Sequence, residues 1–326
     1  MTKPAGLAKL LILLVLISIL LVIIVIHFIP GLSISNYRVL FNAMFGVGSQ
    51  ANTAKIVHTL ITPPEFEISL FSNHVPNARV LKITPSGALL VSSPSKGTVF
   101  LLSDSNDDSQ ADITTPLVSG LNRPHGIDLY DDGKNIWLYI AETHAVGRIA
   151  VDWNTNKVRG NYQRLISDLP KGGNHRTRTI RFGPDGRLYL TAGSSCNVCE
   201  ETDNRRATMM RFRPDGSDGQ IYASGLRNSV GFDWAPWNNY LYATDNGRDL
   251  LGDNYPPCEL NQIEQHGFYG WPYINGFGDL DPDYGEGNEA LLKQSISPSF
   301  GFRAHNAPLG IHFLRHPDRP DGYQRT

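Results

Sequence analysis

The feature that most constrains the fold of this sequence is a tight turn between two short apolar runs, which recurs along most of the chain. Successive copies lie about 50 residues apart. The clearest copy joins Thr179–Phe182 to Leu188–Thr191 through Pro184-Asp185-Gly186, where proline presets φ and glycine accepts a positive φ. The others centre on Pro85-Ser86-Gly87, Asp131-Asp132-Gly133 and, more loosely, Pro236-Trp237-Asn238.

This repeat predicts an all-β fold, and more specifically a β-propeller. A four-stranded unit every 40 to 50 residues is typical of a propeller blade, whereas no window keeps the 3.6-residue period of a helical repeat. A fifth unit starts at Ala307–Phe313, and the sequence ends at Thr326 before the later strands of that unit. We therefore predict an incomplete propeller over residues 63–326, an open arc of about four blades and the first strand of a fifth.

The overall charge limits the possible partners. The 29 Lys and Arg residues nearly balance the 31 Asp and Glu residues, so the chain lacks the strong basic footprint that nucleic-acid binding requires. We expect no nucleic-acid partner.

An apolar run from Leu10 to Ile29 precedes the repeats. About twenty apolar residues span a bilayer as a helix, and Lys3 and Lys9 before the run favour a cytoplasmic amino terminus. We therefore predict a transmembrane anchor in residues 1–30, a connector in residues 31–62, and a propeller on the periplasmic or extracellular side. A cleaved signal peptide is the alternative, although its apolar region is usually shorter.

Polar clusters stand where the innermost strand of each blade should begin, near the central channel. A histidine there can act as a general base near neutral pH, while arginine and asparagine can bind carboxylates or carbonyl oxygens. A single cluster is better explained as a structural loop, but repetition in register favours a functional role for His175, Arg227 and Asn228. The clusters are Arg123-Pro124-His125, Asn174-His175-Arg176, Leu226-Arg227-Asn228 and His305-Asn306.

An acidic loop, Asp245-Asn246-Gly247-Arg248-Asp249, follows the apolar run of the fourth unit. Oxygen-rich loops with glycine are suited to Ca²⁺, although the spacing does not match an EF-hand. A solvated acidic loop explains these residues equally well, so both interpretations stay open at this point.

Two cysteines form the short motif Cys196-Asn197-Val198-Cys199. The motif is compatible with a disulfide, a thiol redox pair or half of a metal site. Only Cys258 remains, so a four-cysteine zinc site is excluded, and Glu200 stands where a c-type haem motif needs histidine. An oxidising compartment favours a local disulfide.

The run from Gly173 to Tyr189, together with Gly225–Phe232 and Ala243–Asp249, resembles a known family. It is similar to the glucose/sorbosone dehydrogenases that use pyrroloquinoline quinone (PQQ), which are six-bladed propellers, and most closely to their sorbosone dehydrogenase branch. The resemblance extends from about Pro63 to the end of the chain. Further matches are Pro256–Asn261, Tyr269–Pro272 and Ala307–Gly310.

The resemblance implies oxidation of an aldose or other sugar aldehyde, with hydride passing to PQQ and an external quinone or cytochrome accepting the electrons. His175 matches the base of the family, and Arg227 and Asn228 match residues that contact the cofactor. Gly247 and Arg248 fall where two backbone carbonyls bind the Ca²⁺ ion next to PQQ, which polarises the quinone.

Two histidines of the other clusters, His125 and His305, are further candidates for cofactor binding. The sequence departs from the family at Cys258, where relatives often carry an acidic residue. Relatives also place additional cofactor-binding basic residues in their last blades, beyond the position of Thr326.

Two other functions compete with a sugar dehydrogenase. A calcium-dependent lactonase would also place a metal in the channel, and an NHL-type interaction propeller would use the channel only as a structural element. The clusters at His175 and at Arg227-Asn228 favour the dehydrogenase, because a scaffold does not need them.

Overall fold

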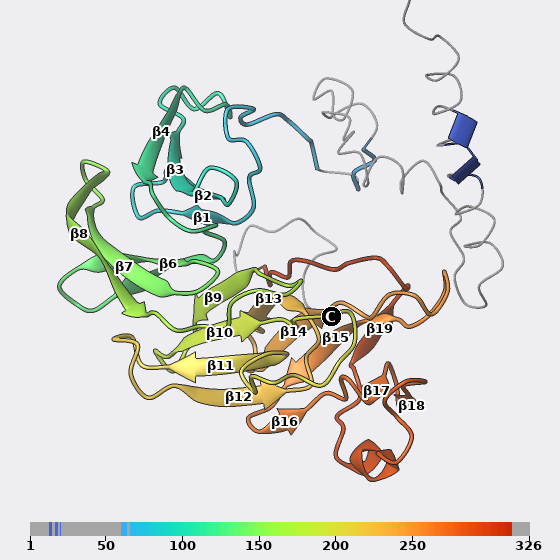
Figure 1. Ribbon diagram of the computed structural model, residues 1–326. Coiled ribbons are helices and arrows are strands. Elements are labelled where there is room, and N and C mark those ends of the chain that lie inside the picture. The colour runs from blue at the N-terminus through green and yellow to red at the C-terminus, as the bar shows by residue number, and fades with distance from the viewer. Residues whose placement is uncertain (1–12, 15–16, 19, 21–59, 64–65, 315–326) are drawn as a thin grey trace, which may run out of the picture.

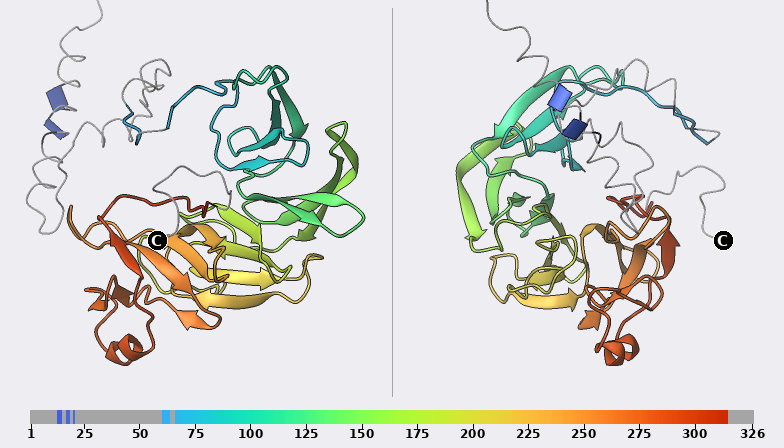
Figure 2. Two further views of the ribbon diagram at one scale, coloured as in Figure 1. Left: turned by 180° about the vertical axis from the view of Figure 1, so that it is seen from behind. Right: turned by 45° about the vertical axis from the view of Figure 1, so that its right-hand side comes forward.

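The computed structural model describes residues 13–14, 17–18, 20, 60–63 and 66–314. Four sheets follow one another along the chain and form an open arc, with the first and fourth sheets at its two ends (Figures 1 and 2). Within each sheet the first four strands are antiparallel and pair in order from the inside outwards. This arrangement confirms the predicted all-β propeller arc of four blades.

Each blade has four strands in chain order. Blade 1 has β1 (Leu81–Ile83), β2 (Leu89–Ser93), β3 (Thr98–Ser103) and β4 (Ile113–Val118). Blade 2 has β5 (Ile127–Asp131), β6 (Ile136–Ala141), β7 (Val146–Asp152) and β8 (Lys157–Ile166). Blade 3 has β9 (Arg178–Phe182), β10 (Leu188–Ala192), β11 (Thr208–Phe212) and β12 (Gln220–Ser224), with β16 (Gly267–Phe268) parallel to β12. Blade 4 has β13 (Ser229–Trp234), β14 (Leu241–Asp245), β15 (Cys258–Ile263) and β19 (Phe300–Phe302). A small hairpin, β17 (Ile274–Asn275) and β18 (Asp279–Leu280), and the 3₁₀ helix η1 (Glu289–Lys293) lie between β16 and β19.

The predicted turns form as the sequence indicates. In blade 3, the amide of Gly186 donates to the carbonyl of Gly183, and the amide of Gly183 donates to Arg187. Gly186 adopts φ +71°, a conformation that glycine reaches without a steric cost. Blade 1 repeats this turn at Gly87, with φ +82°.

In the described part of the chain, the core consists of three apolar clusters, one between each pair of neighbouring blades. In β6, Leu138 and Ile140 pack towards blade 1, while Tyr139 packs towards blade 3. Alternate residues of a strand point to opposite faces of its sheet, so a middle blade buries both faces. This explains why β6 is apolar along its whole length.

Charged pairs connect neighbouring inner strands within the channel. Lys82 Nζ lies 2.6 Å from Asp128 Oδ1, and Arg181 lies 2.6 Å from Asp233 Oδ1. The carboxylate of Asp128 also accepts a hydrogen bond from the amide of Phe182, in the next blade. These contacts set the position of each blade relative to the next.

The prediction that Ala307–Phe313 forms the first strand of a fifth blade is wrong. Residues 307–314 run beside β13, where Gly231 approaches the backbone of Gly310 and the amide of Phe313 donates to Asp233. No strand is assigned to them within the described part of the chain. A single segment beside an inner strand has no further ladder to complete, which is the physical reason for the difference.

The predicted membrane span, Leu10–Ile29, lies almost wholly outside the described residues, as does most of the predicted connector. Among the residues that are described, no helix has both the length and the apolar character needed to cross a membrane.

Candidate active site

The residues before β9 and before β13 converge on Gly193, which follows β10. A Cβ atom at Gly193 would lie 2.6 Å from Asn228 Oδ1 and 2.7 Å from His175 Cβ. Both distances are too short for a real contact, so only glycine lets these two side chains approach. The structure therefore brings His175 and Asn228 together, as their positions in the repeat predicted.

His175 is held in one tautomer by Ser194. Its Nδ1 atom lies 3.0 Å from the carbonyl oxygen and 2.8 Å from the hydroxyl oxygen of Ser194. The hydroxyl itself donates to the carbonyl of Cys196. Because a carbonyl can only accept, Nδ1 must carry the proton. The lone pair is therefore on Nε2, for which the described residues provide no partner.

Burial, followed by the positive charge of Arg227, lowers the pKa of His175 to about 4. The imidazole is consequently neutral at pH 7. A half-buried neutral imidazole with a free Nε2 is able to accept a proton from a bound hydroxyl group.

Two buried arginines, Arg178 and Arg206, fix the loop that carries His175, and sequence reasoning missed both. Arg206 donates to the carbonyls of His175 and Gly193, at 3.3 and 3.2 Å, and to three further carbonyls in residues 170–172. Arg178 donates to the carbonyls of His175 and Pro170. The only sequence signal was their position next to the apolar residues of β9 and β11.

Arg227 is buried and uses its guanidinium mainly to hold two loops. It donates from Nε to the carbonyl of Asn197 and from Nη2 to the side chain of Asn197, both at 2.8 Å. Its Nη1 donates to the carbonyls of Asn246 and Gly247. Asp249 lies 3.7 Å from Nη2. Of the five N–H groups of a guanidinium, at most one remains for a ligand.

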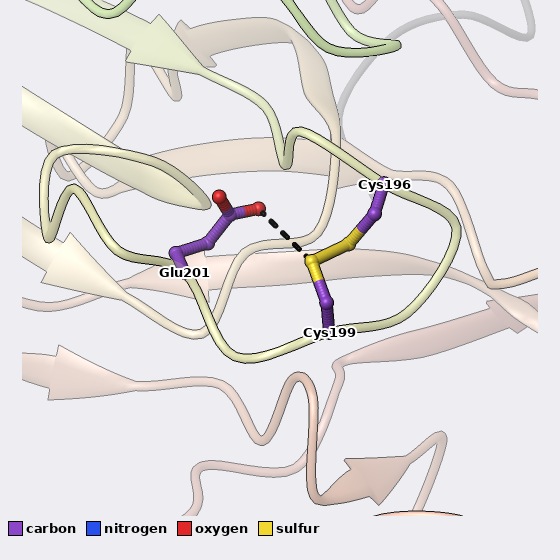
Figure 3. A group of neighbouring side chains, drawn as sticks. All are labelled: Cys196, Cys199 and Glu201. Carbon is purple, nitrogen blue, oxygen red and sulfur yellow. Dashed lines mark hydrogen bonds between the residues drawn. A yellow bond between two sulfur atoms is a disulfide. The ribbon is translucent and has the colours of Figure 1, made fainter.

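Asn197, which sequence reasoning did not single out, lies in the short loop that a disulfide between Cys196 and Cys199 closes. Figure 3 shows this disulfide with the carboxylate of Glu201 beside it. The expectation of a local disulfide is confirmed. The two sulfur atoms and Glu201 lie within the reach of one metal ion, but disulfide sulfurs are not the thiolates that bind metals. The amide of Asn197 also bonds the backbone of Asp249 in both directions.

The predicted metal ligands, Gly247 and Arg248, lie in the loop that follows β14, one of the two loops that Arg227 holds. The carbonyl of Gly247 accepts a hydrogen bond from Arg227 at 2.8 Å. The side chain of Arg248 is buried and donates to Asp281 twice at 2.7 Å and to Asp283 at 2.8 Å. Its buried ion pair anchors the β17–β18 hairpin to the site, a role that the sequence did not reveal.

A set of buried oxygen atoms lies behind the loop, on β14 and β15. Asp245 and Glu259 are paired across the two strands. Burial raises the pKa of Asp245 to about 7. Burial, followed by the charge of Asp245, raises the pKa of Glu259 to about 8. The buried side-chain oxygens of Asn246 and Asn261 have no hydrogen-bond partner among the described residues. Carboxylate and amide oxygens of this kind are the ligands that Ca²⁺ prefers.

The other two predicted histidines have hydrogen-bond partners and neighbours of their own. His305 Nε2 is 2.9 Å from the carbonyl of Gly252, and its Nδ1 is 3.4 Å from Asp249. His305 therefore borders the loop that follows β14, which Arg227 also contacts. His125 is 4% exposed and lines a separate pocket towards blade 1.

Comparison with known proteins places this chain in a family. The family model described as TrAA12-like matches residues 60–266. An uncharacterized protein of Borreliella burgdorferi is 31% identical over 304 residues, which cover 89% of this chain and 76% of that protein. A pyrroloquinoline quinone-dependent sugar dehydrogenase of Hypocrea jecorina is 24% identical over 298 residues, covering 76% of this chain and 69% of that protein.

A solved structure supports the fold. The calcium structure of the Trichoderma reesei family AA12 enzyme superposes with a TM-score of 0.64 at 21% identity, covering 74% of this chain and 71% of that one. At this identity the likeness concerns the propeller architecture. Taken with the sequence matches, it shows that the chain belongs to the TrAA12-like family, within the PQQ-dependent glucose and aldose dehydrogenases.

Proposed function

We propose that this protein oxidises an aldose or other sugar aldehyde, with His175 as the base. One observation carries the proposal: Nδ1 of His175 donates to the carbonyl of Ser194 at 3.0 Å. This bond fixes the tautomer that leaves Nε2 as a proton acceptor. In the reaction Nε2 would take the hydroxyl proton of the sugar, and the imidazolium would be stabilised by the same two Ser194 oxygens.

The site fits a polar planar cofactor in two respects. The amide side chain of Asn228 lies against His175 and has no hydrogen-bond partner among the described residues. Arg227 keeps at most one N–H group, and its positive charge, beside it. PQQ, when bound, would supply the two-electron acceptor for the hydride that leaves the sugar carbon. Asn228 and Arg227 would orient it, and the two buried arginines would keep His175 in place.

Calcium is part of the same proposal. Gly247 and Arg248 were expected to bind Ca²⁺ through their carbonyls, and Asp245, Glu259 and the free oxygen of Asn246 are a second set of suitable donors close in sequence. Ca²⁺ would supply positive charge next to the cofactor. Binding by the buried carboxylates would also remove the cost of keeping them without a cation.

The location and the electron acceptor are proposed on other grounds. A disulfide persists in oxidising compartments, so the Cys196–Cys199 bond supports a periplasmic or extracellular propeller. We propose attachment to the membrane through the run Leu10–Ile29, and an external quinone or cytochrome as electron acceptor. Membership of a dehydrogenase family favours this function over a lactonase or an interaction propeller.

The proposal is tested by adding PQQ and Ca²⁺ to the purified chain and measuring dye reduction with a panel of aldoses. The variant His175→Ala should lower turnover by about 10² to 10⁴-fold, the usual contribution of a general base, with PQQ affinity retained. His144→Ala is the matched control, because the side chain of His144 hydrogen-bonds to Asn122 and has no part in the proposed site. Normal turnover in His175→Ala would contradict the assignment of the base.

A further inference from the structure

A pocket lies between the loops of blades 1 and 2 and the segment that follows His175. It has a volume of about 200 Å³ and is lined by Asn77, Arg79, Pro94, Arg123, His125, Thr143, Arg176 and Thr177. None of the described residues that line it is acidic. Arg176 and Thr177 directly follow His175 in the chain, so the pocket adjoins the loop that carries the proposed base.

The three arginines of this pocket differ from the other arginines at this end of the molecule. Arg178, Arg206, Arg227 and Arg248 each donate to several carbonyls or carboxylates. Arg176 makes one bond, to the carbonyl of Gly173. The side chains of Arg79 and Arg123 make no hydrogen bond or ion pair with any described residue. Three positive charges therefore surround one small space without a counter-charge.

The lining of the pocket includes one buried nitrogen atom, Nδ1 of His125, that can still accept a hydrogen bond. His125 is 4% exposed, and its Nδ1 atom is buried without a hydrogen-bond partner among the described residues. The backbone of Arg178 acts on the ring as a hydrogen-bond acceptor, which by itself favours the charged form. Burial, followed by the charge of Arg79, lowers the pKa of His125 to about 4, so Nδ1 is a lone pair at pH 7. It can accept a hydrogen bond from a hydroxyl group.

The pocket is smaller than the 300 to 1,000 Å³ usual for a whole drug-sized ligand or cofactor. It suits one substituent of a ligand whose reacting end lies at His175.

We propose that this arginine pocket, formed by Arg79, Arg123, Arg176 and His125, is a subsite for an oxyanion group on the sugar substrate. A carboxylate or phosphate matches the guanidinium fork, and a neighbouring sugar hydroxyl donates to His125 Nδ1. The substrate class is then an acidic sugar rather than a neutral aldose. The inference rests on the proposed function for its connection to His175.

The test measures binding and turnover separately. Calorimetry on the protein without PQQ should show that D-glucuronate or D-glucose 6-phosphate binds at least about tenfold more tightly than D-glucose, as one charge-assisted contact provides. With PQQ and Ca²⁺ added, the KM values should follow the same order. Arg123→Gln should raise the KM for the acidic sugar about tenfold and leave kcat and the KM for glucose unchanged. Arg123→Lys should recover part of the loss.

The controls separate this inference from the proposed function. Arg159→Gln removes an exposed charge on β8, where Arg159 pairs with Asp152, and should change nothing. Acidic-sugar binding without any dye reduction would reject the dehydrogenase and keep the subsite. Equal binding of acidic and neutral sugars would overturn the subsite. So would an Arg123→Gln variant in which only PQQ affinity falls, since the pocket would then bind the cofactor.

Discussion

Arg178 and Arg206 share two hydrogen-bond acceptors, the carbonyls of Pro170 and His175. Both guanidiniums are buried. Burial, with a contribution from Arg206, lowers the pKa of Arg178 to about 9. Two adjacent positive charges are tolerated here because backbone carbonyls replace the water that they lose. The arrangement fixes the backbone of the proposed base.

Arg206→Lys should therefore damage the site although the charge is kept. Lysine cannot reproduce five donors in a fixed fork, so several buried carbonyls lose their partners at a cost of about 1–3 kcal/mol each. We expect a lower melting temperature and a fall in kcat of at least tenfold. The neighbouring Arg205→Lys is the control, since Arg205 pairs with Asp203 and Asp168 at the surface. Equal effects of the two substitutions would refute a special role for Arg206.

Gly193→Ala should separate His175 from Asn228. The added Cβ would lie 2.6 Å from Asn228 Oδ1 and 2.7 Å from His175 Cβ, so one side chain must move. We expect kcat to fall about a hundredfold while circular dichroism shows the same fold. Gly310→Ala is the matched control, because a Cβ there meets no atom within 4 Å. Wild-type kcat in Gly193→Ala would show that the contact is not needed for turnover.

The pH dependence of kcat/KM should reflect the low pKa of His175. The base works only when neutral, so activity should fall on the acid side near pH 4 instead of near pH 6.5. The folded-state pKa lies below the unfolded value, so the stability that His175 and His125 contribute is complete above pH 6.5 and is lost as pH falls towards 4. Short assays on freshly acidified enzyme distinguish the two effects. An acid limb at pH 6.5 in stable protein would contradict the lowered pKa.

Asn197→Ala should weaken cofactor binding without removing the cofactor contacts themselves. Arg227 loses the side-chain oxygen of Asn197 and Asp249 loses both of its bonds to that amide, so the two loops separate. We expect PQQ affinity to fall about tenfold, and reduction of Cys196–Cys199 to act in the same direction. Val198→Ala changes the same loop but no recorded hydrogen bond, and serves as the control. PQQ affinity that is unchanged by both Asn197→Ala and reduction would refute the coupling.

Calcium should raise the melting temperature of the protein by several degrees, because a ligand that binds only the folded state stabilises it. Glu259→Gln removes one buried carboxylate and should abolish the shift. Glu264→Gln, at an exposed position, should leave it intact. If the shift persists in Glu259→Gln, the ion is bound elsewhere, with the carbonyls of Gly247 and Arg248 as the next ligands to test.

The local order of the chain could be predicted from the sequence. Proline, aspartate and glycine at turns such as Pro184-Asp185-Gly186 act through their own backbone preferences, and the unbroken apolar run of a strand such as β6 reflects burial on both faces. The polar residues at the start of the inner strands could be found by their register, which is how His175, Arg227 and Asn228 were identified. These signals are local, so they survive without knowledge of the fold.

The contacts between distant segments were decided only by the tertiary structure. Nothing in the sequence near His175 indicates that Ser194 fixes its tautomer, that Arg206 holds its loop, or that Gly193 makes room for Asn228. Arg248 could be read as part of a metal loop, but its ion pair with Asp281 bridges 33 residues. Such pairings depend on how whole blades pack, because the hydrogen-bonding needs of a buried guanidinium are met by whichever carbonyls the fold brings within about 3 Å.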